Sequence, residues 1–160
     1  LLDPLHDVDQ MLLLLQWARR SPSTVVLEIT EREGVNDLPR FRQVLASYRQ
    51  AGFRFAMDDV GEGHSTLEIL AAGAPEFIKI ANSLTRSADQ PGPRAAVEAL
   101  VTFAQSAGAT VIAEGIESQA DLDRMMELGA ELGQGFLLGH PTVGGVHPSI
   151  ATPTAGTIAQ

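Results

Sequence analysis

Short apolar strands alternate with amphipathic helices along most of this chain, and this order constrains its fold more than any other feature. β-Branched and aromatic residues predict strands over residues 25–29, 53–57, 76–80 and 110–113, with a last short extended piece over 133–138. Helical periodicity and glycine stops predict helices over residues 9–19, 38–51, 67–72, 94–107 and 119–128. Because strands that alternate with helices pair in parallel, we expect an α/β fold with a parallel sheet of about five βα units.

The charge and composition exclude several kinds of partner and chemistry. The 160 residues suit one domain and include 11 Lys and Arg against 20 Asp and Glu, a formal net charge of −9. A nucleic acid polymer is bound through a basic face, so we expect no such partner. The absence of cysteine rules out disulfides, zinc–thiolate sites and thiol catalysis, and it is compatible with the cytoplasmic location that we expect.

Two segments differ in amino-acid composition from the rest of the chain. Residues 11–17, Met-Leu-Leu-Leu-Leu-Gln-Trp, are the most apolar stretch, but they fall short of the roughly 18 apolar residues that span a bilayer. We therefore expect a buried helix there and no membrane segment. After His140 the sequence is rich in Pro, Gly, Thr and Ser, and we interpret residues 142–160 as a flexible tail or linker.

Ionisable residues stand near the carboxyl ends of four predicted strands: Glu28, Asp58 (followed by Asp59), Lys79 and Glu114. Side chains alternate along a strand, so each of the four lies opposite the most apolar residues of its strand. Active sites of α/β enzymes lie at this edge, and carboxylate oxygens are the ligands that hard divalent cations prefer. Local pairing with arginine or helix capping explains any one of these residues. Their recurrence in successive units favours convergence on one cavity, where cations or mutual pairing must balance the buried charges.

Five motifs occur in a fixed order along residues 3–141. They read LEITE at 27–31, DDVGEGHSTL at 58–67, FIKI at 77–80, AEGIE at 113–117 and QGFLLGHP at 134–141. In this order and spacing they resemble the EAL family of bacterial cyclic di-GMP phosphodiesterases. The resemblance implies a partial TIM-like (β/α)8 barrel of the EAL type, whose C-terminal portion is residues 1–141. It also implies hydrolysis of cyclic di-GMP to linear diguanylate in second-messenger signalling, with two Mg²⁺ or Mn²⁺ ions that neutralise the phosphate and activate water.

The resemblance implies roles for five residues of the site. Glu28, Asp58 and Asp59 are similar to the metal ligands of the family. Lys79 resembles the lysine that contacts the attacking water or the phosphate, and Glu114 resembles the acidic residue near that water. We therefore predict metal binding by the first three residues and catalytic roles for Lys79 and Glu114.

Three further residues resemble supporting positions of the family. Glu31 is similar to the glutamate that helps to hold the loop after the Asp pair, and Glu117 and Gln134 are similar to residues that support the site. In the family this loop helps to couple the metal site to dimerisation. Besides cyclic di-GMP, we therefore expect a second copy of the chain, or an upstream domain of a parent protein, as a partner.

The chain departs from the family pattern in three places. The Glu-Ala-Leu motif and a metal-binding Asn, which precede the first predicted strand in the family, are missing, so we expect a fragment, a truncated homologue or a site completed by another copy or a partner. The Lys-Ile/Leu-Asp motif reads Lys79-Ile-Ala81, which removes a charged ligand of the second metal. Val60, Glu62 and His64 replace the Phe, Thr and Tyr of the next loop, and we interpret His64 as a partly exposed loop residue. These departures predict impaired catalysis.

Two functions from different classes therefore stay open. The first is a cyclic di-GMP phosphodiesterase domain, which the retained carboxylates and Lys79 favour. The second is a degenerate EAL module that binds cyclic di-GMP or a protein partner without catalysis, which Ala81 favours. The five ordered motifs argue against a third possibility, a metal-dependent hydrolase or aldolase on an unrelated barrel.

Overall fold

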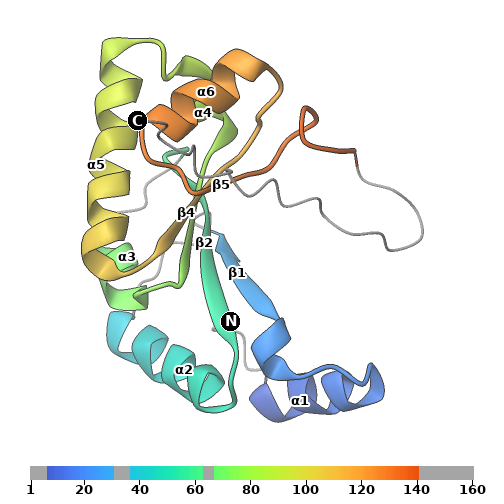
Figure 1. Cartoon of the computed structure of the whole chain (residues 1–160). Helices are drawn as coiled ribbons and strands as arrows, with labels where there is room; N and C mark the ends of the chain where they lie inside the picture. The colour runs from blue at the N-terminus through green and yellow to red at the C-terminus, as the bar shows by residue number, and fades with distance from the viewer. Residues whose placement is uncertain (1–6, 31–36, 63–66, 141–160) are drawn as a thin grey trace, which may run out of the picture.

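A five-stranded parallel sheet forms the centre of the computed structural model, which describes residues 7–30, 37–62 and 67–140 (Figure 1). The strands are β1 (Val26–Thr30), β2 (Arg54–Val60), β3 (Phe77–Ile80), β4 (Thr110–Ala113) and β5 (Leu132–Gly133). They lie side by side in chain order, and each pairs in parallel with the next. The predicted α/β class with about five βα units is confirmed.

Helices connect the strands, and several of them begin or end at capping residues of the sequence. They are α1 (Val8–Trp17), the short 3-10 helix η1 (Pro22–Thr24), α2 (Leu38–Gln50), α3 (Leu67–Gly73), α4 (Asn82–Ser87), α5 (Pro91–Ala107) and α6 (Gln119–Glu127). Asp37 accepts from the Arg40 N–H to cap α2, and Ser118 forms a capping box with Asp121 at the start of α6. Gly108, with φ of 71°, ends α5 in the left-handed conformation that favours glycine. Within the described residues no helix is long and apolar enough to cross a membrane.

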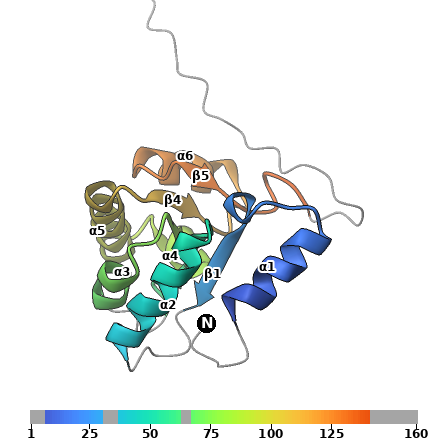
Figure 2. The same cartoon turned by 90° about the horizontal axis from the view of Figure 1, so that it is seen from below.

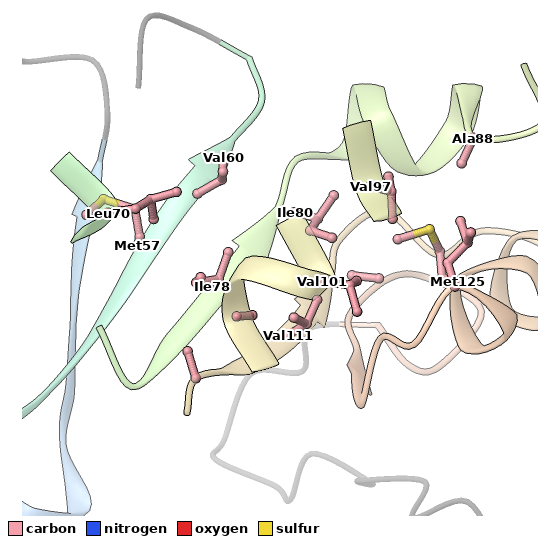
Figure 3. Close-up of a cluster of buried hydrophobic side chains, with 14 of the residues drawn as sticks. Met57, Val60, Leu70, Ile78, Ile80, Ala88, Val97, Val101, Val111 and Met125 are labelled. Carbon is pink, nitrogen blue, oxygen red and sulfur yellow. The ribbon is translucent and has the colours of Figure 1, made fainter. Parts of the chain in front are cut away.

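The larger of two buried clusters lies between β2–β4 and the helices that cover one face of the sheet (Figure 3). Helices α3 and α5 lie on this face (Figure 1, left). Met57, Ile78, Ile80 and Val111 point into the cluster from the strands, and Val97 reaches it from α5. Because side chains alternate along a strand, burial of Ile78 and Ile80 on this face turns the residue between them to the other face.

Helix α1 belongs to the smaller cluster, but the prediction that it is a buried helix was wrong. Val8, Met11, Leu12 and Leu15 pack against that cluster, whose buried residues come mainly from α2 and the start of β2, and no residue of α1 is fully buried. Trp17 is 91% exposed, and Leu13 and Leu14 are exposed as well. Figure 2 shows α1 beside β1 at one end of the sheet. The helix is apolar around most of its circumference, and only one side of it has a neighbour among the described residues.

Two other predicted elements differ from the structure. The extended piece expected over 133–138 ends at Gly133, because residues 136–138 form a turn in which the Leu138 N–H donates to the Gly135 carbonyl. Helix α4 was not predicted, since its six residues are too few and too polar to show a helical period. The predicted tail, residues 142–160, lies outside the described residues.

Candidate functional site

Lys79 is the centre of a group of carboxylates at the carboxyl edge of the sheet. Its Nζ atom lies 2.6 Å from Asp58 Oδ1, 2.8 Å from Glu114 Oε1 and 3.0 Å from Glu28 Oε1. The Lys79 side chain is only 8% exposed, and it is the only lysine of the chain. The four strands predicted to carry convergent ionisable groups do bring them together. The roles assigned to these residues stay predictions.

Strand alternation and register place these side chains. Ile78 and Ile80 point into the core, so Lys79 points to the opposite face of β3. On β2, Asp58 lies beside Thr30 of β1 in the parallel register. On the other side of Lys79, the Glu114 N–H donates to the Ile80 carbonyl at the end of β3, which keeps Glu114 next to the lysine.

Alternation does not explain how Asp59 joins its neighbour Asp58, since adjacent residues of a regular strand point to opposite faces. The structure resolves this with an irregularity: the pairing of β2 with β3 shifts between Met57 and Val60, and Asp59 adopts a positive φ of 55°. Such a conformation costs about 1–3 kcal/mol in a non-glycine residue and is concentrated at functional sites. One carboxylate oxygen each from Asp58, Asp59 and Glu114 lie within 4.8 Å of one another.

Burial and neighbouring charges shift two pKa values in this group. Burial alone would lower the pKa of Lys79, but its contacts with Asp58, Glu114 and Glu28 outweigh burial and raise that pKa. Burial is also the main cause that raises the pKa of Glu114; Lys79 opposes it, and the negative Asp58 and Asp59 add to it. The lysine therefore stays charged, and Glu114 is more basic than an ordinary glutamate.

The donor set fits a hard divalent cation. Three carboxylates contact a single ammonium group and a fourth, that of Asp59, lies beside two of them, so the cluster keeps an excess of negative charge. Lys79 contacts one oxygen each of Asp58 and Glu114, and these two carboxylates and that of Asp59 each offer an oxygen to the same small region. All of these donors are oxygen atoms, the type that Mg²⁺, Mn²⁺ and Ca²⁺ prefer.

Ala81 stands where the family pattern predicted a further carboxylate. It is fully buried and begins α4 as an N-cap without a side-chain hydrogen bond. Its N–H donates to the Val60 carbonyl, so position 81 lies beside the end of β2, next to the Asp pair. One turn along α4, the buried Thr85 hydroxyl has no hydrogen-bond partner among the described residues.

The remaining predicted residues lie around this group or beyond the described part of the chain. Glu117 pairs with Arg86 of α4, whose Nε also donates to Asn82 Oδ1, rather than with Lys79. Gln134 is held by its backbone, since its N–H donates to the Ala113 carbonyl and its own carbonyl accepts from Ile116. Glu31 lies outside the described residues. Sequence reasoning missed Arg86, which belongs to no motif.

Comparisons with known proteins identify a family. The family model described as EAL domain matches residues 4–141. The chain is 35% identical over 122 residues to the cyclic di-GMP phosphodiesterase PdeL of Escherichia coli, and 30% identical over 133 residues to the blue light- and temperature-regulated antirepressor BluF of the same bacterium. These matches cover 75% and 82% of this chain and 33% of each relative, so the chain spans about a third of the curated relatives it matches.

Solved structures with the same fold contain a cyclic dinucleotide and divalent metal. The calcium and cyclic di-GMP complex of Klebsiella pneumoniae BlrP1 superposes with a TM-score of 0.81 at 34% identity, over 87% of this chain and 36% of that one. A manganese and cyclic di-GMP complex of BlrP1 superposes with a TM-score of 0.78. These likenesses confirm the predicted partial TIM-like barrel.

Proposed function

Because this chain belongs to the EAL domain family, we propose that its acidic edge is the carboxyl-terminal part of a cyclic di-GMP phosphodiesterase site. The observation that carries the proposal is the convergence of Glu28, Asp58 and Glu114 on Lys79, with contacts of 2.6–3.0 Å, inside the segment that matches the family. Cyclic di-GMP as the ligand is supported by the relatives and the solved complexes described above, and hydrolysis of one of its phosphodiesters would give linear diguanylate.

We propose that Asp58, Asp59 and Glu28 hold divalent cations here, with Mg²⁺ or Mn²⁺ as the working ions and two ions in the complete domain. When bound, such ions neutralise the phosphodiester and lower the pKa of a water molecule. The three clustered oxygens of Asp58, Asp59 and Glu114 supply the charge that such binding needs. Ala81 provides no carboxylate, so the second ion would be held more weakly than in family members with Asp at this position.

The protein's own groups have complementary tasks in this proposal. Lys79, which stays charged, donates to a phosphate oxygen and balances the negative charge that grows during attack. Glu114, with its raised pKa, accepts the proton of the attacking water more readily than an ordinary carboxylate. Burial of the lysine among its carboxylates holds both groups in fixed positions before the ligand arrives.

Incubation of the purified chain with cyclic di-GMP and Mn²⁺ tests the proposal, with linear diguanylate measured by chromatography. We expect product from the wild type and a loss of about a hundredfold or more in Asp58→Asn, which removes a charge from the metal set. Asp123→Asn is the matched control, because Asp123 is an exposed carboxylate of α6 that bonds to Gln119. Equal rates in Asp58→Asn and Asp123→Asn would refute the assignment of this site.

A binding module without catalysis is the second candidate, and two observations favour it. Position 81 lacks its carboxylate, and one relative is named an antirepressor rather than an enzyme. If this candidate holds, a folded wild type binds cyclic di-GMP in EDTA as tightly as in Mn²⁺, and Asp58→Asn leaves that affinity unchanged. A second copy or an upstream domain as the partner, and a cytoplasmic location, stay predictions. Sedimentation at several concentrations tests the first of these.

A further inference from the structure

Helix α1 has a second apolar side, which stays exposed. The side that packs on the smaller cluster consists of Val8, Met11, Leu12 and Leu15. The same spacing, shifted by two residues, gives a second stripe, here called the outer stripe: Gln10, Leu13, Leu14 and Trp17. A shift of two residues turns about 200° around an α-helix, so the outer stripe points away from the cluster. Leu13 is 59% exposed, Leu14 65% and Trp17 91%.

The outer stripe has the shape of a socket. Its four side chains line one open hollow on the surface of the helix. Four residues with this spacing form the hole that a side chain of a facing helix fills in knobs-into-holes packing. Figure 2 shows α1 at the edge of the molecule, beyond β1. Exposed apolar patches mark interaction sites, and tryptophan is enriched among the residues that dominate binding. The outer stripe is therefore suited to receive a second helix.

Charges at the two ends of α1 indicate which helix fits. Asp9 lies in the first turn, and Arg19 follows the last turn; both are exposed. The Arg19 N–H donates to the Gln16 carbonyl, which fixes this residue at the end of the helix. Leu14 stands midway between the two charges, five residues from each. A second α1 turned end to end about Leu14 thus brings Asp9 of each copy beside Arg19 of the other, whereas a parallel copy brings like charges together.

From this symmetry we propose that the outer stripe is a self-association surface, on which α1 of a second copy packs antiparallel about a two-fold axis at Leu14. Leu14 of each copy enters the hollow of the other, and both Trp17 rings lose their exposure to water. Such an interface uses the same patch on both copies and closes as a dimer. One helix from each copy makes a small interface, so the dissociation constant should be micromolar. Because α1 carries no residue of the acidic edge, the inference goes beyond the proposed function and does not rest on it.

Sedimentation equilibrium of the full chain tests the surface. We expect a reversible dimer in the wild type and a loss of affinity of about thirtyfold or more in Trp17→Ala, since a buried interface tryptophan contributes at least that factor. Phe136→Ala is the matched control: Phe136 is another large exposed side chain, at 58%, but lies outside α1, and its removal should change the affinity less than twofold. Far-ultraviolet circular dichroism shows whether each variant keeps its fold.

A charge exchange tests the antiparallel arrangement. Asp9→Arg alone and Arg19→Asp alone should each weaken the dimer about tenfold, because each change turns two attractive pairs into repulsive ones. The double variant restores both pairs in reverse and should regain the wild-type affinity within about twofold. Aspartate suits position 19, where the backbone has a positive φ of 52°. A double variant as weak as the single ones would overturn the arrangement.

Disulfide trapping locates the two-fold axis. The chain has no cysteine, so Leu14→Cys introduces its only thiol, which the axis places beside the same thiol of the second copy. Under mild oxidation this variant should form a covalent dimer much faster than Gln16→Cys, which is exposed on the same helix but outside the outer stripe. A wild type that stays monomeric up to about 1 mM, or a dimer that Trp17→Ala leaves unchanged, would overturn the inference and leave the proposed function standing.

Discussion

The substitution Ala81→Asp returns a carboxylate to a position that is built for one. Ala81 is fully buried at the N-cap of α4, with φ of −57° and ψ of 147° and no side-chain hydrogen bond at the cap. An aspartate there can accept from the first free N–H groups of the helix, which is the usual task of an N-cap residue. It can also accept from the Thr85 hydroxyl, which is buried without a partner in the described part of the chain. Position 81 is bonded to Val60, beside the Asp pair.

The balance of these effects depends on metal. A new buried charge without a counter-ion costs about 3–5 kcal/mol, and the Asp cap returns about 1 kcal/mol. We therefore expect Ala81→Asp to lower the free energy of unfolding by about 3 kcal/mol in EDTA. A second divalent cation, held tightly only by the variant and present at a hundred times its dissociation constant, returns about 2.7 kcal/mol relative to wild type, which nearly cancels the loss. With Mn²⁺ the variant should be about as stable as wild type and should turn over cyclic di-GMP faster.

Urea unfolding followed by far-ultraviolet circular dichroism measures this, because Trp17, at 91% exposure, is a poor fluorescence reporter of folding. A loss of about 3 kcal/mol moves the midpoint by about 1–3 M urea. Ala81→Asn is the matched control: it can cap α4 but adds no charge, so Mn²⁺ should stabilise it no more than wild type. If Ala81→Asp and Ala81→Asn respond equally to Mn²⁺, the reasoning about position 81 is wrong.

Two further predictions concern alkaline pH and a crowded glycine. Because folding raises the pKa of Lys79, its charged form stabilises the fold fully below about pH 10.5, and this stability is lost as the pH rises further. Folding also raises the pKa of Tyr48, so the fold loses stability above pH 10.0, where the tyrosine of the unfolded chain ionises. The free energy of unfolding should fall between pH 10 and 12, less steeply in Tyr48→Phe and in Lys79→Met; an unchanged slope in both would contradict this. Gly115→Ala should destabilise the fold by about 1–3 kcal/mol, because Gly115 has φ of 69° and a Cβ there would meet Asn82 Oδ1 at 2.1 Å. Gly108→Ala, at φ of 71° with no atom within 4 Å, measures the backbone cost alone in the same urea experiment, and equal losses would show that the contact at residue 115 is harmless.

The sheet was predictable because its strands are short β-branched runs between glycine stops. Strand β4 has the predicted bounds, and β1 and β3 differ by a residue. Strand β2 continues through the Asp pair to Val60, whereas the sequence predicted that it ends at residue 57. Residues 136–138 form a turn instead of the predicted extended piece. This turn depends on a tertiary contact, the close packing of Gly135 on Ile116. Such contacts between distant segments leave no local pattern.

Alternation along the strands also predicted most of the site. It placed Lys79 opposite the apolar residues of its strand, and the parallel register then brought Asp58 and Glu114 to it. The position of Asp59 depends on a register shift and a positive φ, which no residue pattern indicates. The Arg86–Glu117 pair joins α4 to the segment after β4, 31 residues apart, and it could be found only in three dimensions.

A single, enclosed lysine has a practical consequence for this protein. Lys79 is the chain's only lysine, its side chain is 8% exposed, and its amine contacts three carboxylates, so the folded side chains offer almost no free amine to an acylating reagent. Acylation beyond the amino terminus then requires the ammonium to leave its carboxylates and lose a proton. The rate of that modification, followed by mass spectrometry, therefore reports how often the site opens. Any ligand that closes the site should lower this rate, whether or not the ligand is turned over.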